Sequence, residues 1–112
     1  MEFNNLNKMV GWERTKALYL IQTAQDLGMD LDSYGEVAIN PNSGYTYIWL
    51  EDYNFSLYMP IDCELKKKDI WILYSCPVDG EESEIQLENN TLNDLEKWAE
   101  RMAEESREKE EV

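Results

Sequence analysis

The spacing of apolar residues changes along the chain, and each change predicts a different kind of element. Between residues 6 and 27 apolar residues recur every three or four positions, which is typical of a helix with one buried side. Gly28 stands where a helix C-cap is expected, whereas Gly11 weakens the first turns, so the start is predicted as late as Trp12. The apolar stripe of this helix is Leu6, Met9, Val10, Ala17, Leu18, Ile21 and Ala24.

From residue 36 onward the apolar period is two, which predicts strands. Short runs rich in β-branched and aromatic residues are separated by turn residues such as Pro, Asn, Asp and Gly. Short connections favour an antiparallel meander. The segment 61–69 is interpreted as a longer loop or as an extension of its neighbours. The five predicted strands are 36–40, 45–51, 55–60, 70–76 and 84–88.

A second helix is predicted after Thr91, which is followed three residues later by Asp94 in a capping-box pattern. An apolar stripe, Leu92, Leu95, Trp98, Ala99 and Met102, forms one side of it. From Glu105 no large apolar residue occurs until Val112, so residues 105–112 are predicted to be a frayed acidic tail after a single domain of residues 1–104.

Together these elements predict an α+β fold with an N-terminal helix, a five-stranded antiparallel meander and a C-terminal helix. The layer rule packs both helices on one sheet face. The second and third strands are predicted to form a hairpin with a loop of two residues, 53–54, or of four, 51–54. Leu50 is then predicted opposite Leu57, Ile48 opposite Met59 and Trp49 opposite Tyr58. The aliphatic side chains then share the face that the helices cover. The other face is aromatic: Tyr45, Tyr47, Trp49, Tyr58 and Trp71.

This aromatic face has two interpretations. It is either an ordinary outer sheet face, because Tyr and Trp suit a half-buried pleat, or a contact surface for a foreign partner or a second copy of the chain. Stacking of single-stranded nucleic acid is not expected, because the strands carry almost no Lys or Arg.

The charge of the chain excludes several function classes. The 112 residues hold 24 Asp and Glu against 10 Lys and Arg, a net charge of −14, with no histidine. Such a molecule is not expected to bind a bare phosphate backbone. It also lacks the imidazole most often used for acid–base chemistry and metal binding. No known catalytic motif is present, so we expect no enzyme, no catalytic residues, no cofactor and no metal.

The segment Asp30 to Val37 resembles the first half of a calcium-binding loop. Acids stand at its first and third positions and Gly35 at its sixth, but Pro41 occupies the twelfth position, where a bidentate Glu is required. A polar connection between a helix and a strand explains the same residues, so calcium binding is not expected.

The two cysteines, Cys63 and Cys76, lie 13 positions apart without a zinc-binding pattern. The chain begins without an export signal and contains no apolar run long enough for a membrane span, so the thiols are expected to be reduced, no membrane is expected as a partner, and a cytoplasmic location is expected.

The acidic residues are concentrated toward the C-terminus, where residues 77–112 hold 13 acidic and 4 basic side chains. A patch on the second helix is either a solvated surface or an electronegative surface that steers toward a basic partner: Glu96, Glu100, Glu104, Glu105 and Glu108. The leading prediction is a small acidic non-enzymatic binding protein, of the phage or mobile-element inhibitor or immunity type, that engages a basic partner. Mimicry of nucleic acid is a sub-hypothesis of this prediction. The alternative is a homodimeric accessory or chaperone-like domain that associates through the aromatic face.

Overall fold

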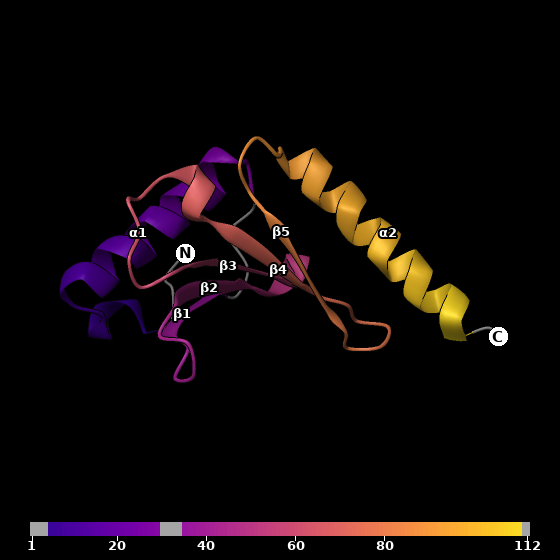
Figure 1. Cartoon of the computed structure of the whole chain (residues 1–112), viewed down its shortest axis with the longest axis horizontal. Coiled ribbons are helices and arrows are strands. Elements are labelled where there is room, and N and C mark those ends of the chain that lie inside the picture. The colour runs from indigo at the N-terminus through magenta and orange to yellow at the C-terminus, as the bar shows by residue number, and fades with distance from the viewer. Residues whose placement is uncertain (1–4, 30–34, 111–112) are drawn as a thin grey trace.

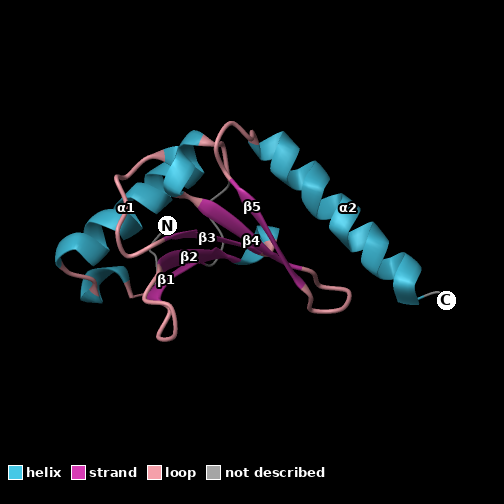
Figure 2. Ribbon diagram, in the orientation of Figure 1, coloured by secondary structure: helices cyan, strands magenta, loops and turns pink. Residues whose placement is uncertain are grey.

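The fold consists of a single five-stranded sheet, with one long helix before it in the sequence and another after it (Figure 1). The structure is a computed structural model that describes residues 5–29 and 35–110. Short 3-10 turns at Leu6–Lys8, Glu51–Tyr53 and Lys67–Asp69 connect the main elements, as Figure 2 shows. The helices and strands are α1 (Gly11–Asp26), β1 (Gly35–Ile39), β2 (Thr46–Leu50), β3 (Phe55–Met59), β4 (Trp71–Ser75), β5 (Glu82–Gln86) and α2 (Leu92–Glu110).

The sheet has the order β1-β2-β3-β4-β5, and every neighbouring pair is antiparallel. This arrangement confirms the predicted α+β meander, with each strand within two residues of its predicted bounds. The period-two pattern is clearest in β2 and β3, where fully buried residues alternate with half-buried ones. Residues 61–69 form a loop that contains one 3-10 turn.

The register of the β2–β3 hairpin differs from the prediction by two residues. Four residues connect the strands: the Glu51–Tyr53 turn and Asn54, which adopts a left-handed conformation with φ 55°. This is the longer of the two predicted loops, but the predicted pairs fit only the two-residue loop, because a four-residue loop places Leu50 opposite Phe55. Because side chains alternate with a period of two, the shift changes the partners but leaves every side chain on its predicted face. The observed pairs are Leu50 with Phe55, Trp49 with Ser56, Ile48 with Leu57, Tyr47 with Tyr58 and Thr46 with Met59.

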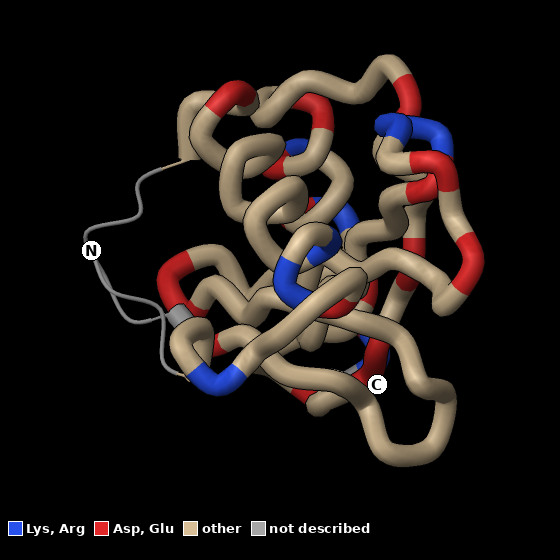
Figure 3. The backbone as a smooth tube through the Cα atoms, turned by 90° about the vertical axis from the view of Figure 1, so that its left-hand side faces the viewer, with Lys and Arg blue, Asp and Glu red and all other residues tan. Residues whose placement is uncertain are grey.

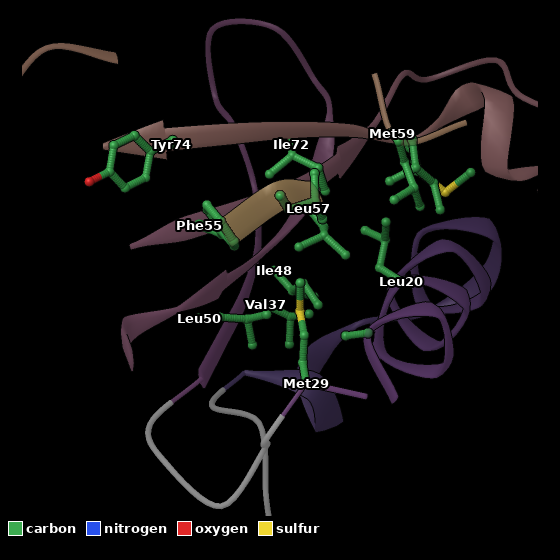
Figure 4. Close-up of a cluster of buried hydrophobic side chains, with 14 of the residues drawn as sticks. Leu20, Met29, Val37, Ile48, Leu50, Phe55, Leu57, Met59, Ile72 and Tyr74 are labelled. Atoms are coloured by element: carbon green, nitrogen blue, oxygen red, sulfur yellow. The ribbon is translucent and has the colours of Figure 1, made fainter. Parts of the chain in front are cut away.

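Both helices pack on the same face of the sheet. Ala17, Leu20 and Ala24 of α1 are fully buried in the hydrophobic core, and Figure 4 shows Leu20 beside the strand residues. The α2 side chain Trp98 lies with its ring centroid 6.4 Å from that of Phe55 and 6.0 Å from that of Tyr74. These two rings are on the covered side of β3 and β4. The hydrophobic core therefore lies between the two helices and the aliphatic face of the sheet that they bury.

The buried side of α1 differs from the predicted stripe. Leu18 is 44% exposed and Val10, which precedes the helix, is 75% exposed, whereas Lys16 is fully buried. The helix begins only at Gly11, and its small residues Ala17 and Ala24 face the sheet. Small side chains allow a close approach of helix and sheet, so the bulky residues at neighbouring positions are turned outward.

The second helix begins as predicted and extends further than predicted. The Thr91 N–H donates to the Asp94 carboxylate over 2.9 Å, and the Asp94 N–H donates to the Thr91 hydroxyl over 3.2 Å, which completes the capping box and lowers the pKa of Asp94. The helix continues to Glu110, through most of the predicted frayed tail. Ser106 is buried there, because the Cys76 thiol donates to its hydroxyl over 3.6 Å. Residues 111–112 lie outside the described part.

Candidate functional site

The face of the sheet opposite the helices, called the open face below, is the candidate site. None of the described helices covers it. Its central side chains come from alternate positions of β2 and β3, and they are half-buried rather than fully buried. The outward-facing residues of β1, β4 and β5 complete the face, because the strand register aligns them in rows with those of β2 and β3.

A shallow hollow of about 520 Å³ lies in the open face. Four aromatic side chains line it: Tyr45, Tyr47, Trp49 and Tyr58. Three carboxylates also line it: Glu36, Glu82 and Glu84. The remaining lining residues are mostly small or neutral: Asn40, Ser43, Ser56, Leu73 and Ser75. No Lys or Arg is among these lining residues, so the hollow combines aromatic surface with negative charge.

The structure brings the predicted aromatic residues together. The Tyr45 and Tyr58 rings stack, with centroids 5.8 Å apart and planes 15° from parallel. Tyr58 pairs in register with Tyr47 on one side and with Trp71 on the other. Trp71 is 36% exposed and lies on the same face, outside the lining of the hollow. Four of the five predicted residues therefore line one hollow, and the fifth adjoins it.

The three carboxylates of the hollow are the part of the site that the sequence reasoning missed. Glu84 is exposed and interacts with Tyr58, and burial together with this carboxylate raises the pKa of the Tyr58 hydroxyl well above its ordinary value. The period of two along β1 and β5 could have placed these carboxylates on the open face. Glu36, Glu82 and Glu84 occupy the strand positions that alternate with the buried residues of β1 and the inward residues of β5.

The second predicted surface, on α2, is separate from the open face. Glu96, Glu100, Glu104, Glu105 and Glu108 are all exposed, as predicted. A shallow groove of about 550 Å³ between β5 and α2 includes Glu100 and Glu104, but Lys97 and Arg101 line it too. The basic side chains dilute the negative charge along this helix. Figure 3 shows acidic positions on several other parts of the trace as well.

The structure adds little evidence for the other candidate sites, the half calcium loop and the two cysteines. Residues 30–34, which hold the acidic ligands of the half calcium loop, lie outside the described part. Within residues 5–29 and 35–110, no cluster of His, Cys, Asp and Glu side chains is placed to hold a metal ion. Cys63 and Cys76 are not joined to each other, and Cys76 is buried. Neither α1 nor α2 is both long and apolar enough to cross a bilayer.

Comparisons with protein-family models, with curated proteins and with solved structures give no match.

Proposed function

We propose that this chain is a non-enzymatic binding domain whose open face holds a positively charged segment of a partner protein. One observation carries the proposal: the hollow in the open face joins four aromatic rings to three carboxylates and has no Lys or Arg in its lining. Aromatic side chains are the commonest anchors of protein interfaces, and they also attract cations through their ring faces. The net charge of −14 adds long-range attraction for such a partner.

The open face supports the proposal better than the acidic surface of α2. On α2 the glutamates alternate with Lys97, Arg101 and Arg107, and the groove beside them is lined by a single aromatic side chain, Trp98, against four in the open face. On the open face the carboxylates lie beside half-buried rings, where a bound cation loses part of its water and interacts more strongly.

A second copy of the chain is the alternative occupant of the open face. Tyr45 and Trp71 are 37% and 36% exposed, and such rings suit a homodimer interface. Two open faces that meet across a two-fold axis would, however, bring Glu36, Glu82 and Glu84 of both copies together. Repulsion between these carboxylates favours a basic foreign partner over self-association.

A basic partner is compatible with the inhibitor or immunity role that the sequence predicts. Enzymes that handle nucleic acid and some toxins present basic grooves, and a carboxylate-lined surface can occupy such a groove in place of phosphates. Under this proposal, nucleic acid and this chain compete for the same surface of the partner, and the complex weakens as salt rises from about 50 to 200 mM.

The test uses deca-arginine as a model partner and isotope-labelled protein in NMR titrations. We expect saturable shifts at the outward residues of β2, β3 and β4, and weaker binding at higher salt. Replacement of Trp49 and Tyr58 by Ser should reduce the affinity about tenfold or more, whereas Glu100→Gln with Glu104→Gln should change it less than threefold. Shifts confined to α2, or no binding, would overturn the proposal.

Self-association is tested separately by light scattering at high protein concentration. The proposal predicts a monomer. A dimer that dissociates when Tyr45 and Trp71 are replaced by Ser would support the second copy as occupant and contradict the foreign partner.

A further inference from the structure

The centre of the open face holds a small residue surrounded by large ones. Ser56 pairs in register with Trp49 on one side and with Leu73 on the other, and Tyr58 is the next outward residue along β3. All four residues line the hollow. Because the Ser56 side chain is short, the surface is lowest at this position and its larger neighbours form the walls.

The row of side chains through Ser56 ends in carboxylates. Leu73 pairs with Glu84 on β5, and Trp49 pairs with Glu36 on β1. Neighbouring strands lie about 4.8 Å apart, so Glu84 is two strands, or about 10 Å, from Ser56. An extended Glu side chain and an extended basic side chain can bridge that distance. Glu82 lines the hollow on the same strand as Glu84.

We infer that the hollow above Ser56 receives one arginine side chain of the partner, with Trp49 and Tyr58 against its guanidinium and Glu84 as counter-ion. This inference depends on the proposed function, because it names the group that the open face recognises. The walls are aromatic and apolar, so a bound side chain is partly shielded from water, while the carboxylate at the end of the row supplies the opposite charge.

Arginine fits this arrangement better than lysine. The guanidinium is planar and weakly hydrated, so it stacks on an aromatic ring and still donates hydrogen bonds in its own plane. The carboxylate of Glu84 and the hydroxyls of Ser56 and Ser75 are acceptors that line the same hollow. A lysine ammonium keeps more of its water and offers no flat surface to the rings.

The test measures the binding of blocked pentapeptides of the form Gly-Gly-X-Gly-Gly, where X is arginine, lysine or citrulline. Citrulline keeps the shape of arginine and lacks its charge. The indole N–H signal of Trp49 reports occupancy in NMR titrations. We expect the arginine peptide to bind about 3- to 10-fold more tightly than the lysine peptide, and the citrulline peptide to give no saturable shift. Equal affinity for arginine and lysine, or for arginine and citrulline, would overturn the assignment.

Two variants, each with a matched control, distinguish the effect of filling the hollow from the effect of removing its charge. Ser56→Leu fills the hollow and leaves every ring and carboxylate in place, whereas Ser56→Ala is its matched control and keeps the hollow open. We expect Ser56→Leu to abolish the indole shift and Ser56→Ala to leave the affinity within about twofold. Glu84→Gln should weaken arginine binding about fivefold, and Glu96→Gln on α2 should not. If Ser56→Leu does not fold, the Glu84 and Glu96 pair carries the test.

Deca-arginine distinguishes the failure of this inference from the failure of the proposed function. If deca-arginine still shifts the open face of Ser56→Leu with unchanged affinity, the arginine site is wrong and the proposed function stands. If deca-arginine shifts no residue of the open face in the original chain, the proposed function itself is wrong.

Discussion

The Nζ atom of Lys16 lies 3.1 Å from the Oε2 atom of Glu13, although the Lys16 side chain is fully buried. The same Glu13 oxygen accepts a hydrogen bond from the Thr46 hydroxyl over 2.6 Å. Lys16 also donates to the carbonyl oxygens of Pro60 and Ile61, over 3.5 and 3.4 Å. Glu13 therefore links α1 to β2, and the buried ammonium of Lys16 links α1 to the segment that follows β3.

We expect Lys16→Met to lower the free energy of unfolding by about 1–3 kcal/mol, because it removes the ammonium from the Glu13 carboxylate and its hydrogen bond to the Pro60 carbonyl. Glu13 still accepts from Thr46, and the Ile61 carbonyl still accepts from the Trp12 indole. Since Glu13 is 31% exposed, water partly compensates and the loss stays below that of a fully buried pair. Urea unfolding measures the effect. The double variant with Glu13→Gln should lose less than the sum of the two single losses. Strict additivity would show that the pair is not coupled.

The Glu13 carboxylate also predicts an acid dependence of stability. Its hydrogen bond from Thr46 and its contact with Lys16 hold its pKa below the ordinary value of 4.5. The folded state therefore binds fewer protons than the unfolded state, and the contribution to stability is complete above about pH 5 and is lost as the pH falls through the folded pKa. The stability difference between the original chain and Glu13→Gln should be constant from pH 8 to pH 5 and shrink below pH 4.5. A difference that does not change down to pH 3 would contradict this account.

Shortening α2 tests whether residues beyond Glu105 contribute to the fold. A chain that ends at Glu105 loses Ser106, which is only 6% exposed and accepts the hydrogen bond from Cys76. We expect a loss of about 1 kcal/mol in thermal or urea unfolding. A chain that ends at Glu110 is the control and should match the full chain. Equal stability of the two shortened chains would favour the frayed tail that the sequence predicts.

Two glycines with nearly the same backbone conformation form a matched pair for a test of local packing. Gly44 has φ +75° and Gly80 has φ +76°. A Cβ atom at Gly44 would lie 2.7 Å from Cδ1 of Ile61, whereas one at Gly80 would meet nothing within 4 Å. Both changes to Ala should cost about 1 kcal/mol for the left-handed backbone.

Gly44→Ala should cost a further ~0.5–1 kcal/mol for displacement of the Ile61 side chain. Chemical unfolding of both variants measures this difference, and an Ile61→Ala background should abolish it. If the two glycine variants lose equal stability in the original background, Ile61 moves aside without cost.

The elements of this fold could be predicted from the sequence because their signals are local. Alternation of apolar residues marks the strands, and the Thr91 and Asp94 pair marks the start of α2. The hairpin register could not be derived, because it depends on how the Glu51–Tyr53 turn and Asn54 close the loop. The burial of Lys16 was not foreseen either, because the carbonyls to which it donates lie 44 and 45 residues away in the sequence.

The candidate site was predicted only in part. The aromatic half follows from alternation within β2 and β3, which the sequence displays directly. The acidic half comes from β1 and β5, at the two edges of the sheet, and its proximity to the rings depends on the pairing of all five strands. The end of α2 depends on the contact between Ser106 and Cys76, which no local pattern encodes.

The order of the strands in the sheet repeats their order along the chain, and this has a consequence for how the molecule folds. Every strand pairs with the next one along the chain, and only the connection between β3 and β4 is longer than six residues, so little chain entropy is lost before pairing is rewarded. Hairpins can therefore assemble one after another while the chain is still being synthesised, and α2 docks last. We expect refolding in a single phase on a timescale of roughly milliseconds.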